Sequence, residues 1–263
     1  MIKSIPFRDP DGRKRHLDPI YEDEHLLVIN KASGLPVLPD RWDPNLPNVR
    51  DLITRARLQE NPSLEHPIWI VHRIDASTSG ILLLAKTANM HRELNQMFAE
   101  AQIEKNYLCI VQGAPPADTG TVTLSLEKTP SAKRPVRISH QGRPAETTWK
   151  IIERFKRFAL VEASPKTGRM HQIRVHMQSL GCPLAFDPLY GQRQPITIAD
   201  FKRNARSTIK TDRPSAALID RLTLHAARLS FTDPLGGIEH SFEAAIPKDL
   251  AALLKTLRKW DLP

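Results

Sequence analysis

The stretch that decides the fold runs from Val71 to Thr87 and reads VHRIDASTSGILLLAKT. One acid, Asp75, stands between the basic pair His72 and Arg73 and a group of small hydroxyl residues. An uninterrupted apolar segment, GILLLAK at 80–86, follows and is typical of a buried β-strand. Most loop aspartates are turn or capping residues, but a carboxylate at such a junction can also act as a nucleophile or a general base.

Outward from this stretch, short strands alternate irregularly with a few helices. Apolar patterning predicts strands at 25–30, 68–71, 80–86, 105–111, 121–126, 147–152, 158–163 and 222–231. Helical periodicity and end signals predict helices at 48–58, 88–101, 168–181 and 247–260. We therefore expect an α+β fold in a single domain, with a mixed, mainly antiparallel sheet flanked by helices and loops.

Bulk composition excludes several classes of protein. With 263 residues, of which 40% are hydrophobic, the chain can bury a sizeable core in one large domain. No apolar run approaches the roughly 20 residues that span a bilayer, and the first residues lack the apolar core of a signal peptide. Cys109 and Cys182 are too few for a disulfide framework and do not stand at metal-ligand spacing. We expect a cytoplasmic protein without membrane partners, in which both cysteines are small core residues.

The charge indicates a polyanionic partner. Lys and Arg total 38 against 29 Asp and Glu, a net charge of +9 that favours binding of nucleic acid. Residues 128–157 hold nine basic side chains that are able to release counterions from phosphates. These are Lys128, Lys133, Arg134, Arg137, Arg143, Lys150, Arg154, Lys156 and Arg157. From the residues alone, a solvated strand face is an equally good interpretation of this basic patch.

The expected helix at 168–181 carries the second group of chemically interesting residues. Its apolar stripe is expected to be Met170, Ile173, Met177 and Leu180, with Gly181 just beyond its end. Arg174 borders that stripe, so its side chain either reaches solvent or pairs with a carboxylate in a half-buried cleft.

The sequence contains no common metal-binding or phosphate-binding motif. His171 and His176 are five residues apart rather than four, so we expect surface or half-buried packing and no metal site. There is no phosphate-binding glycine loop and no nucleophile elbow. Lys31 and Lys86, at the ends of expected strands, are interpreted as solvated.

Five motifs in order resemble the RluA-type pseudouridine synthases. HRIDASTSGILLLAK resembles that family's aspartate signature, and the other four segments resemble its remaining motifs in sequence. They are YEDEHLLVINKASGLPVLP at 21–39, EKNYLCIVQG at 104–113, PKTGRMHQIRVHMQSLGCPLAFDPLYG at 165–191 and LHAARLSFTDP at 224–234. Departures are small: Ile74 replaces leucine, while Ala185 and Phe186 stand where a small apolar residue and glycine are more usual.

The resemblance implies an enzyme that isomerises uridine to pseudouridine in RNA, with neither a metal nor an organic cofactor. It implies that Asp75 is the essential carboxylate and that Tyr107 stacks on the flipped target base. It also implies that Arg174 forms an ion pair with Asp75, and that His72 and Arg73 line the cleft. Three first steps remain open for Asp75: attack on C1′ of the ribose, attack on C6 of uracil, or removal of the 2′ hydrogen. We expect Arg169 and His171 to contact the RNA backbone.

The resemblance leaves the substrate RNA open between ribosomal and transfer RNA. It covers residues 21–247 and implies an N-terminal extension at 1–20 followed by a catalytic domain at 21–263, which we expect to be a monomer. The residues before position 21 do not resemble a ribosomal-protein-like RNA-binding module. Substrate recognition would then fall to the catalytic domain, the 128–157 patch and the basic segment at 200–213.

Two alternatives remain at this stage. One is a non-catalytic RNA-binding protein that retains the synthase fold, which would bind RNA without forming pseudouridine. The other is a basic nucleic-acid-binding module of a different type, which would prefer duplex DNA in competition.

Overall fold

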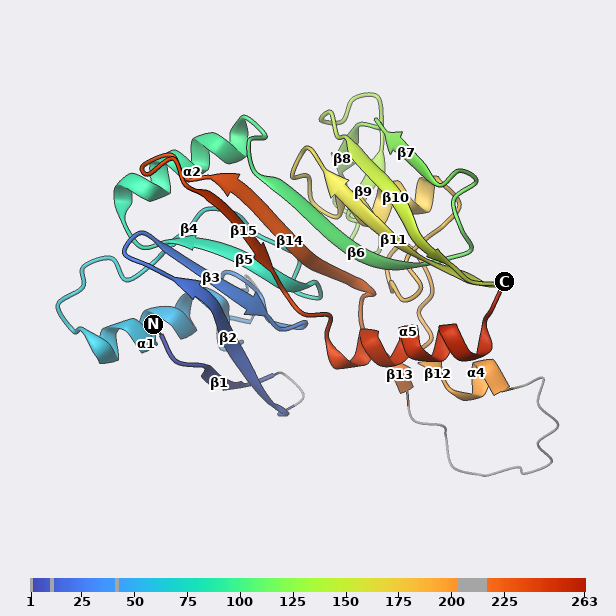
Figure 1. Ribbon diagram of the computed structural model, residues 1–263, viewed down its shortest axis with the longest axis horizontal. Helices are drawn as coiled ribbons and strands as arrows, with labels where there is room; N and C mark the ends of the chain where they lie inside the picture. Colours follow the sequence, from blue (N-terminus) through green and yellow to red (C-terminus); the bar gives the residue numbers. More distant parts are fainter. Residues whose placement is uncertain (1, 10–11, 41–42, 203–216) are drawn as a thin grey trace. The chain divides into compact units, whose positions relative to one another are not determined.

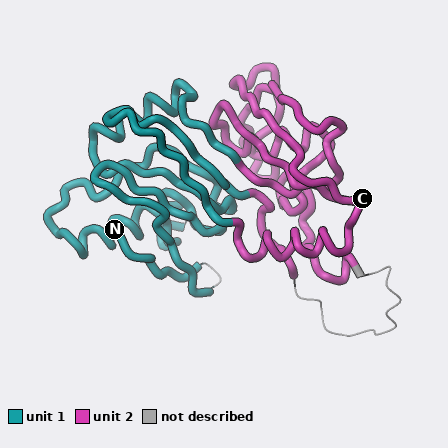
Figure 2. Tube along the Cα trace, viewed as in Figure 1, with its two compact units in different colours: residues 1–106, 225–245 teal, residues 107–224, 246–263 magenta. Residues whose placement is uncertain are grey.

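A computed structural model describes residues 2–9, 12–40, 43–202 and 217–263. It divides into two compact units (Figure 2). Unit 1 comprises residues 1–106 and 225–245, and unit 2 comprises residues 107–224 and 246–263. The chain crosses between the units inside strands at 106–107 and 224–225, and between β15 and α5 at 245–246.

Unit 1 is built around a sheet with the strand order β1-β2-β3-β5-β14, in which β4 also pairs with β5 and β15 with β14 (Figure 1). Its elements are β1 (Ile5–Arg8), β2 (Lys14–Glu22), β3 (Leu26–Lys31), α1 (Val49–Glu60), β4 (Trp69–Ile70), β5 (Ser79–Ala85), α2 (Ala88–Ala99), β14 (Leu224–Thr232) and β15 (Glu239–Glu243). Only β5 and β14 are parallel among these pairs. The segment expected as an N-terminal extension forms β1 and most of β2, while the predicted domain limits stay a prediction.

The central strand of unit 1 explains its apolar run. Every residue of β5 is buried, as expected for a strand covered on both faces. Gly80 has φ +111°, and a Cβ there would lie 2.2 Å from the carbonyl oxygen of Ala226. Only glycine therefore lets β5 approach β14 this closely.

Two helices of unit 1 begin where the sequence predicts. The side chain of Asn48 accepts a hydrogen bond from the Asp51 N–H and caps α1. Thr87 caps α2 in the same way, and α2 buries Met90, Leu94 and Met97 against the sheet. Burial of this apolar face is the main force that fixes α2 on the sheet.

Unit 2 contains an antiparallel sheet with the order β6-β11-β10-β7 and two two-stranded antiparallel sheets, β8-β9 and β12-β13. Its elements are β6 (Glu104–Gln112, which begins in unit 1), β7 (Thr119–Val122), β8 (Leu126–Lys128), β9 (Val136–Ile138), β10 (Thr147–Arg154), β11 (Phe158–Pro165), α3 (Gln172–Ser179), β12 (Ile196–Thr197), α4 (Ala199–Lys202), β13 (Ala217–Ile219) and α5 (Lys248–Trp260). The α+β class and the mixed, mainly antiparallel sheet are confirmed.

Two predicted elements differ from the structure. The expected strand at 121–126 is wrong as one element, because β7 ends at Val122 and β8 begins at Leu126. The expected helix at 168–181 begins only at Gln172, so Met170 precedes it and is 39% exposed instead of joining the apolar stripe. The cause of the late start is His171, whose φ of +54° is left-handed and incompatible with a helix.

Candidate active site

Asp75 stands at the start of a tight turn that leads from β4 into β5. Its main-chain carbonyl accepts a hydrogen bond from the Thr78 N–H at 3.0 Å, which closes the turn. Asp75 itself is half-buried, whereas Thr78 and Ser79 are buried. The buried strand therefore fixes the backbone that carries the carboxylate.

The ammonium of Lys31, the last residue of β3, binds the Asp75 turn. Its Nζ donates a hydrogen bond to the carbonyl of Ala76 at 2.8 Å. The same Nζ donates to the carbonyls of Ala32 at 2.9 Å and Leu35 at 2.8 Å. One buried cation thus joins two loops that lie 45 residues apart in the chain.

Two further hydrogen bonds connect the same loops. The Gly34 N–H donates to the carbonyl of Ala76 at 2.8 Å, and the Ser33 hydroxyl donates to the carbonyl of Ser77 at 2.7 Å. The two carbonyls that follow Asp75 are therefore held by the loop after β3, which fixes the main chain next to Asp75.

The interpretation of both strand-end lysines as solvated is wrong. Lys31 is fully buried at 0% exposure. Lys86 has a side chain only 14% exposed and pairs with Glu22 at 2.7 Å, and it also donates to the carbonyl of Asp23. One signal in the sequence was available, because Lys31 ends an apolar strand and directly precedes a loop that contains glycine.

His72 is a neutral histidine packed between the strands and α2. Its Nε2 accepts a hydrogen bond from the Leu83 N–H at 2.9 Å, and its ring stacks on Phe98 with centroids 4.6 Å apart. Burial, aided by the charge of Lys105, lowers the pKa of His72 to about 3. His72 is therefore neutral in the folded chain near neutral pH, and its predicted role in substrate binding stays a prediction. The neighbouring Arg73 is exposed.

In unit 2, Arg174 forms a buried ion pair with Asp187. Its Nε and Nη2 donate to Oδ2 and Oδ1 of Asp187, each at 2.8 Å, and the two side chains are 6% and 0% exposed. The Arg174 guanidinium also lies over the Tyr190 ring, 5.1 Å from its centroid. The interpretation that Arg174 reaches solvent is therefore wrong, and its planar group is held on two sides.

The predicted ion pair between Asp75 and Arg174 joins different units, so it stays a prediction. Tyr107 stands in β6 opposite Ala163 of β11 and packs at the edge of the unit 2 core. Its predicted stacking on the target base also stays a prediction.

Arg169 and His171 directly precede α3. The Arg169 Nε donates to the carbonyl of Pro144 at 3.0 Å. The His171 Nδ1 lies 2.9 Å from the Tyr190 hydroxyl, which accepts a hydrogen bond from the Val136 N–H of β9. Their predicted RNA contacts are untested, but both residues connect the start of α3 to neighbouring loops.

The sequence interpretation missed a buried polar group beneath α3. His176 is fully buried, not surface or half-buried as expected, and its ring nitrogens bond to the Thr147 hydroxyl at 2.9 Å and the Leu124 carbonyl at 3.0 Å. The Gln172 amide also donates to the Thr147 hydroxyl, at 2.9 Å. These contacts seat α3 on β10, and they involve residues too far apart in the chain for a local pattern to reveal them.

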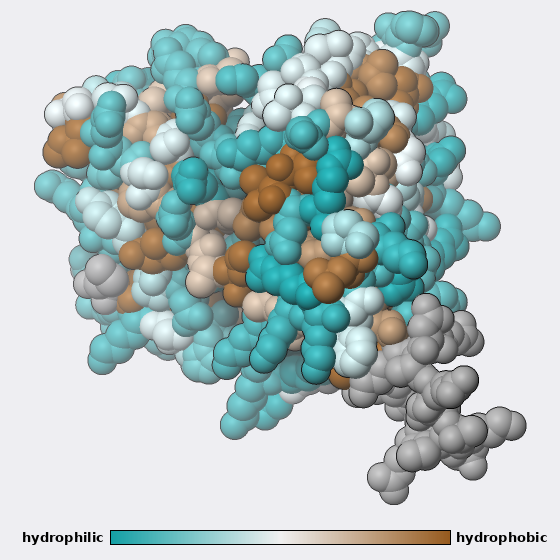
Figure 3. Space-filling model, turned by 45° about the vertical axis from the view of Figure 1, so that its right-hand side comes forward, coloured by the Kyte–Doolittle hydropathy of each residue, from teal (hydrophilic) through white to brown (hydrophobic). Residues whose placement is uncertain are grey.

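All nine basic residues of the 128–157 patch are exposed. Four of them form ion pairs, namely Arg137 with Glu127, Lys150 with Glu162, Arg154 with Asp118 and Arg157 with Asp261. Lys133 and Arg134, in the β8-β9 connection, form no ion pair among the described residues. Hydrophilic side chains also cover most of the face drawn in Figure 3, where hydrophobic residues form separate patches. Of the basic segment at 200–213, residues 203–213 lie outside the described residues.

Within the described part of the chain, no group of three or more acidic, histidine or cysteine side chains is placed to hold a metal ion. Both cysteines are free and buried, which confirms their expected place in the core. No helix in the same part is long and apolar enough to cross a membrane.

Comparisons with known proteins agree on one family. The family model described as RNA pseudouridylate synthase matches residues 25–179. Ribosomal large subunit pseudouridine synthase C of Salmonella typhi is 38% identical over 243 residues, which cover 91% of this chain and 69% of that protein. An uncharacterized RNA pseudouridine synthase of Bacillus subtilis (strain 168) is 35% identical over 244 residues, which cover 92% and 73%.

Two solved structures share the fold. Human RNA Pseudouridylate Synthase Domain Containing 4 superposes with a TM-score of 0.70 at 24% identity, covering 91% of this chain and 92% of its own. Human RNA Pseudouridylate Synthase Domain Containing 1 gives a TM-score of 0.61 at 22% identity, covering 94% and 96%.

Proposed function

This chain belongs to the RNA pseudouridylate synthase family and is an RNA-modifying isomerase, and from that premise we propose that it converts specific uridines of ribosomal RNA to pseudouridine with Asp75 as the catalytic carboxylate. The names of its relatives favour ribosomal RNA as the substrate. Transfer RNA is the second substrate class to be tested. We place catalysis in residues 21–263 of a cytoplasmic monomer that uses no cofactor.

The observation that carries the proposal is the anchoring of the Asp75 turn. A structural role for the turn needs only the main-chain carbonyl of Asp75, which bonds to the Thr78 N–H. The buried ammonium of Lys31 and the Gly34 N–H nevertheless both donate to the next carbonyl, that of Ala76. Support of this kind positions a reacting group, because catalysis depends on holding its geometry closely.

The reaction is an isomerisation and needs no external reactant. The bond between C1′ of the ribose and N1 of uracil breaks, the base turns, and a bond forms between C1′ and C5. The proton on C5 leaves and N1 gains a proton, so atoms and charge balance. A carboxylate at Asp75 supplies the nucleophile or base that the first step requires, and the target base must first be flipped out of the RNA.

Arg174 and Tyr107 take supporting roles in the proposal. The Arg174 guanidinium remains charged at any relevant pH and keeps a nearby carboxylate ionised without reacting itself. Its bidentate bond to Asp187 holds the guanidinium plane in one orientation. The Tyr107 ring offers a face on which the flipped uracil can stack.

The decisive experiment uses purified protein and total RNA from a strain that lacks the gene. Pseudouridine is mapped by chemical labelling and sequencing after incubation with the native protein, with Asp75→Ala or with Asp75→Asn. We expect new sites in ribosomal RNA with the native protein only, while both variants retain RNA binding.

A matched control is Asp233→Asn. Asp233 is also a loop aspartate of unit 1, and its carboxylate caps a turn by accepting from the N–H groups of Leu235 and Gly236. This variant should lose stability but keep forming pseudouridine. New sites confined to transfer RNA would redirect the substrate assignment, and RNA binding without any new site would favour the non-catalytic alternative.

A further inference from the structure

The hairpin β1-β2 is a basic element that precedes the residues matched by the family model. Residues 3–16 carry a net charge of +3, from five basic and two acidic side chains with histidine neutral. The family match begins only at residue 25. All the basic side chains of this segment and His16 are exposed, namely Lys3, Arg8, Arg13, Lys14, Arg15 and His16.

Among the described residues of the hairpin, one ion pair offsets this charge. Arg15 pairs with Asp9 at 3.0 Å, and the Arg8 Nη1 donates to the Gly12 carbonyl. Neither Arg13 nor Lys14 forms an ion pair among the described residues. Desolvation raises the pKa of Asp9, but hydrogen bonds and charges from Arg15 and Arg13 outweigh it and lower that pKa overall, as expected in a positive potential.

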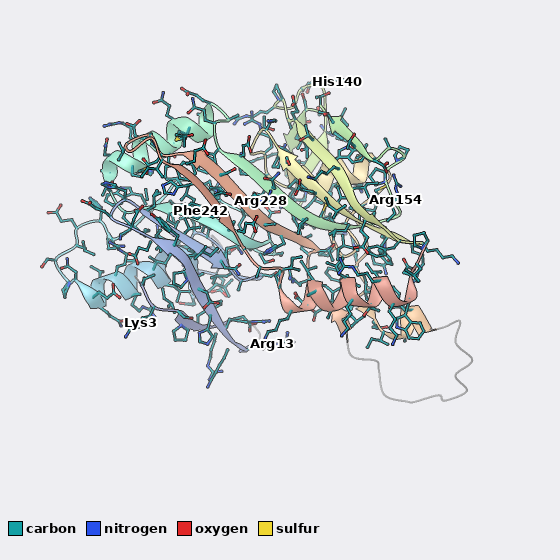
Figure 4. The ribbon with its side chains drawn as sticks, viewed as in Figure 1. Lys3, Arg13, His140, Arg154, Arg228 and Phe242 are labelled. Carbon is teal, nitrogen blue, oxygen red and sulfur yellow. The ribbon has the colours of Figure 1, made fainter. Side chains whose placement is uncertain are left out.

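The sheet places this charge at the same end as Asp75. Asn30 of β3 pairs with Asp18 of β2 on one side and with Ile81 of β5 on the other, and both pairings are antiparallel. The first residues of β2 and β5 therefore lie at the same end of the sheet. The hairpin turn precedes Lys14, the first residue of β2, and the Asp75 turn precedes Ser79, the first residue of β5. Arg13 lies at the free end of the hairpin (Figure 4).

We propose that the β1-β2 hairpin binds the phosphate backbone of the RNA beside the target uridine; the proposal rests on the proposed function. β2 is separated from β5 only by β3, a lateral distance of roughly 10 Å at about 4.8 Å per strand spacing. Phosphates follow one another every few ångströms along a nucleic-acid strand, so nucleotides close to the flipped base reach the hairpin. Arg13 and Lys14 supply charge without base contacts, which fits backbone binding that is independent of sequence.

The test measures RNA binding and turnover of Arg13→Gln/Lys14→Gln in the full chain. The probe is protein-free large-subunit ribosomal RNA, titrated over a series of salt concentrations, and KM and kcat are measured on the same RNA. Removal of two cations that bind phosphates should weaken binding about tenfold at physiological salt and reduce the slope of log K against log salt by about 1.4–1.8. KM should rise with little change in kcat. The charge-reversed variant Arg13→Glu/Lys14→Glu should weaken RNA binding more than the neutral variant does.

The matched control removes two exposed basic residues of unit 1 that lie on helices, in the variant Arg55→Gln/Arg92→Gln. Its affinity and salt slope should stay near the native values. Equal effects from the control and the hairpin variant, or no effect of the hairpin variant on affinity and slope, would overturn the proposal. If the native protein forms pseudouridine and the hairpin variant has the same RNA affinity and activity, only the role of the hairpin is refuted. If the native protein forms no pseudouridine on any RNA, the proposed function is refuted.

Discussion

At the residue scale, the contact that defines the candidate site is the buried ammonium of Lys31. A charge without exposure to water is costly unless hydrogen bonds replace its hydration. Here three main-chain carbonyls do so, and one of them belongs to the residue after Asp75. We therefore expect Lys31 to act as a positioning residue through the turn.

Replacement of Lys31 by Met keeps the length of the side chain but removes every donor. We expect the free energy of unfolding to fall by about 2–4 kcal/mol, because three carbonyls, of which that of Leu35 is buried, lose a hydrogen-bond donor. We also expect kcat to fall more than KM changes, because the Asp75 turn loses its anchor. Urea unfolding and steady-state kinetics on RNA measure the two effects.

Lys86→Met is the matched control for that variant. Lys86 is also a strand-end lysine with half-buried acceptors, but its partners Glu22 and Asp23 do not belong to the Asp75 turn. This variant should lose stability and keep the native kcat. A native kcat in Lys31→Met would remove Lys31 from the positioning role.

The neutral His72 predicts a pH dependence of stability. Its pKa is about 3 in the folded chain and about 6.5 when exposed. Below pH 6.5 His72 therefore binds a proton in the unfolded chain but not in the folded chain. The free energy of unfolding consequently falls as the pH drops toward 3. The stabilisation is fully present above pH 6.5 and is lost by up to about 1.4 kcal/mol per pH unit below it.

The measurement compares urea unfolding of the native chain and His72→Gln between pH 7.5 and pH 4. The native chain should lose stability more steeply, because the variant has no titrating ring at this position. Parallel curves would mean that His72 does not titrate differently in the folded and unfolded chains.

At the scale of elements, α3 shows how a buried ion pair orients a helix. Arg174 lies on α3, and Asp187 lies in the following loop, where its Oδ1 also accepts the Leu189 and Tyr190 N–H groups. The carboxylate therefore organises its own loop and the guanidinium together. This arrangement explains why a charged residue is tolerated among the buried residues of α3.

Asp187→Asn should destabilise the chain by about 3 kcal/mol, because it leaves a buried guanidinium with reduced compensation. The pair of Arg221 with Asp249 offers a comparison with similar bidentate geometry but greater exposure, at 14% and 40%. Asp249→Asn should cost about 1 kcal/mol or less. Urea unfolding of both variants tests the difference, and equal losses would argue against burial as the cause.

At the scale of the whole molecule, positive charge determines how the enzyme meets RNA. A net charge of +9 favours fast association and makes affinity depend strongly on salt. The basic residues do not contribute equally to RNA affinity, because some residues of the 128–157 patch already pair with carboxylates.

Neutralising Lys133, Arg134 and Arg137 to Gln should weaken RNA binding and lower the salt slope by about 0.7–0.9 for each phosphate that the protein no longer binds. Lys150→Gln/Arg154→Gln is the control inside the same patch, because ion pairs with Glu162 and Asp118 compensate both of its residues, whereas in the triple variant only Arg137 is paired, with Glu127. Its effect per charge should be smaller. An unchanged affinity and slope in the triple variant would exclude the patch from RNA binding.

Local features of the fold were predictable from the sequence because they depend on neighbouring residues. The caps Asn48 and Thr87 act within three residues, and the apolar run of β5 reflects burial on both faces. The late start of α3 was missed because the left-handed backbone of His171 leaves no mark in hydrophobic periodicity.

The sequence by itself determined the α+β class, most of the elements and, through ordered motifs, the family. Only the tertiary structure decided that Lys31 is buried against the Asp75 turn, that Arg174 pairs with Asp187, and that the β1-β2 hairpin shares an end of the sheet with Asp75. The reason is physical: periodicity and capping act over a few residues, whereas these contacts join segments that only chain folding brings together.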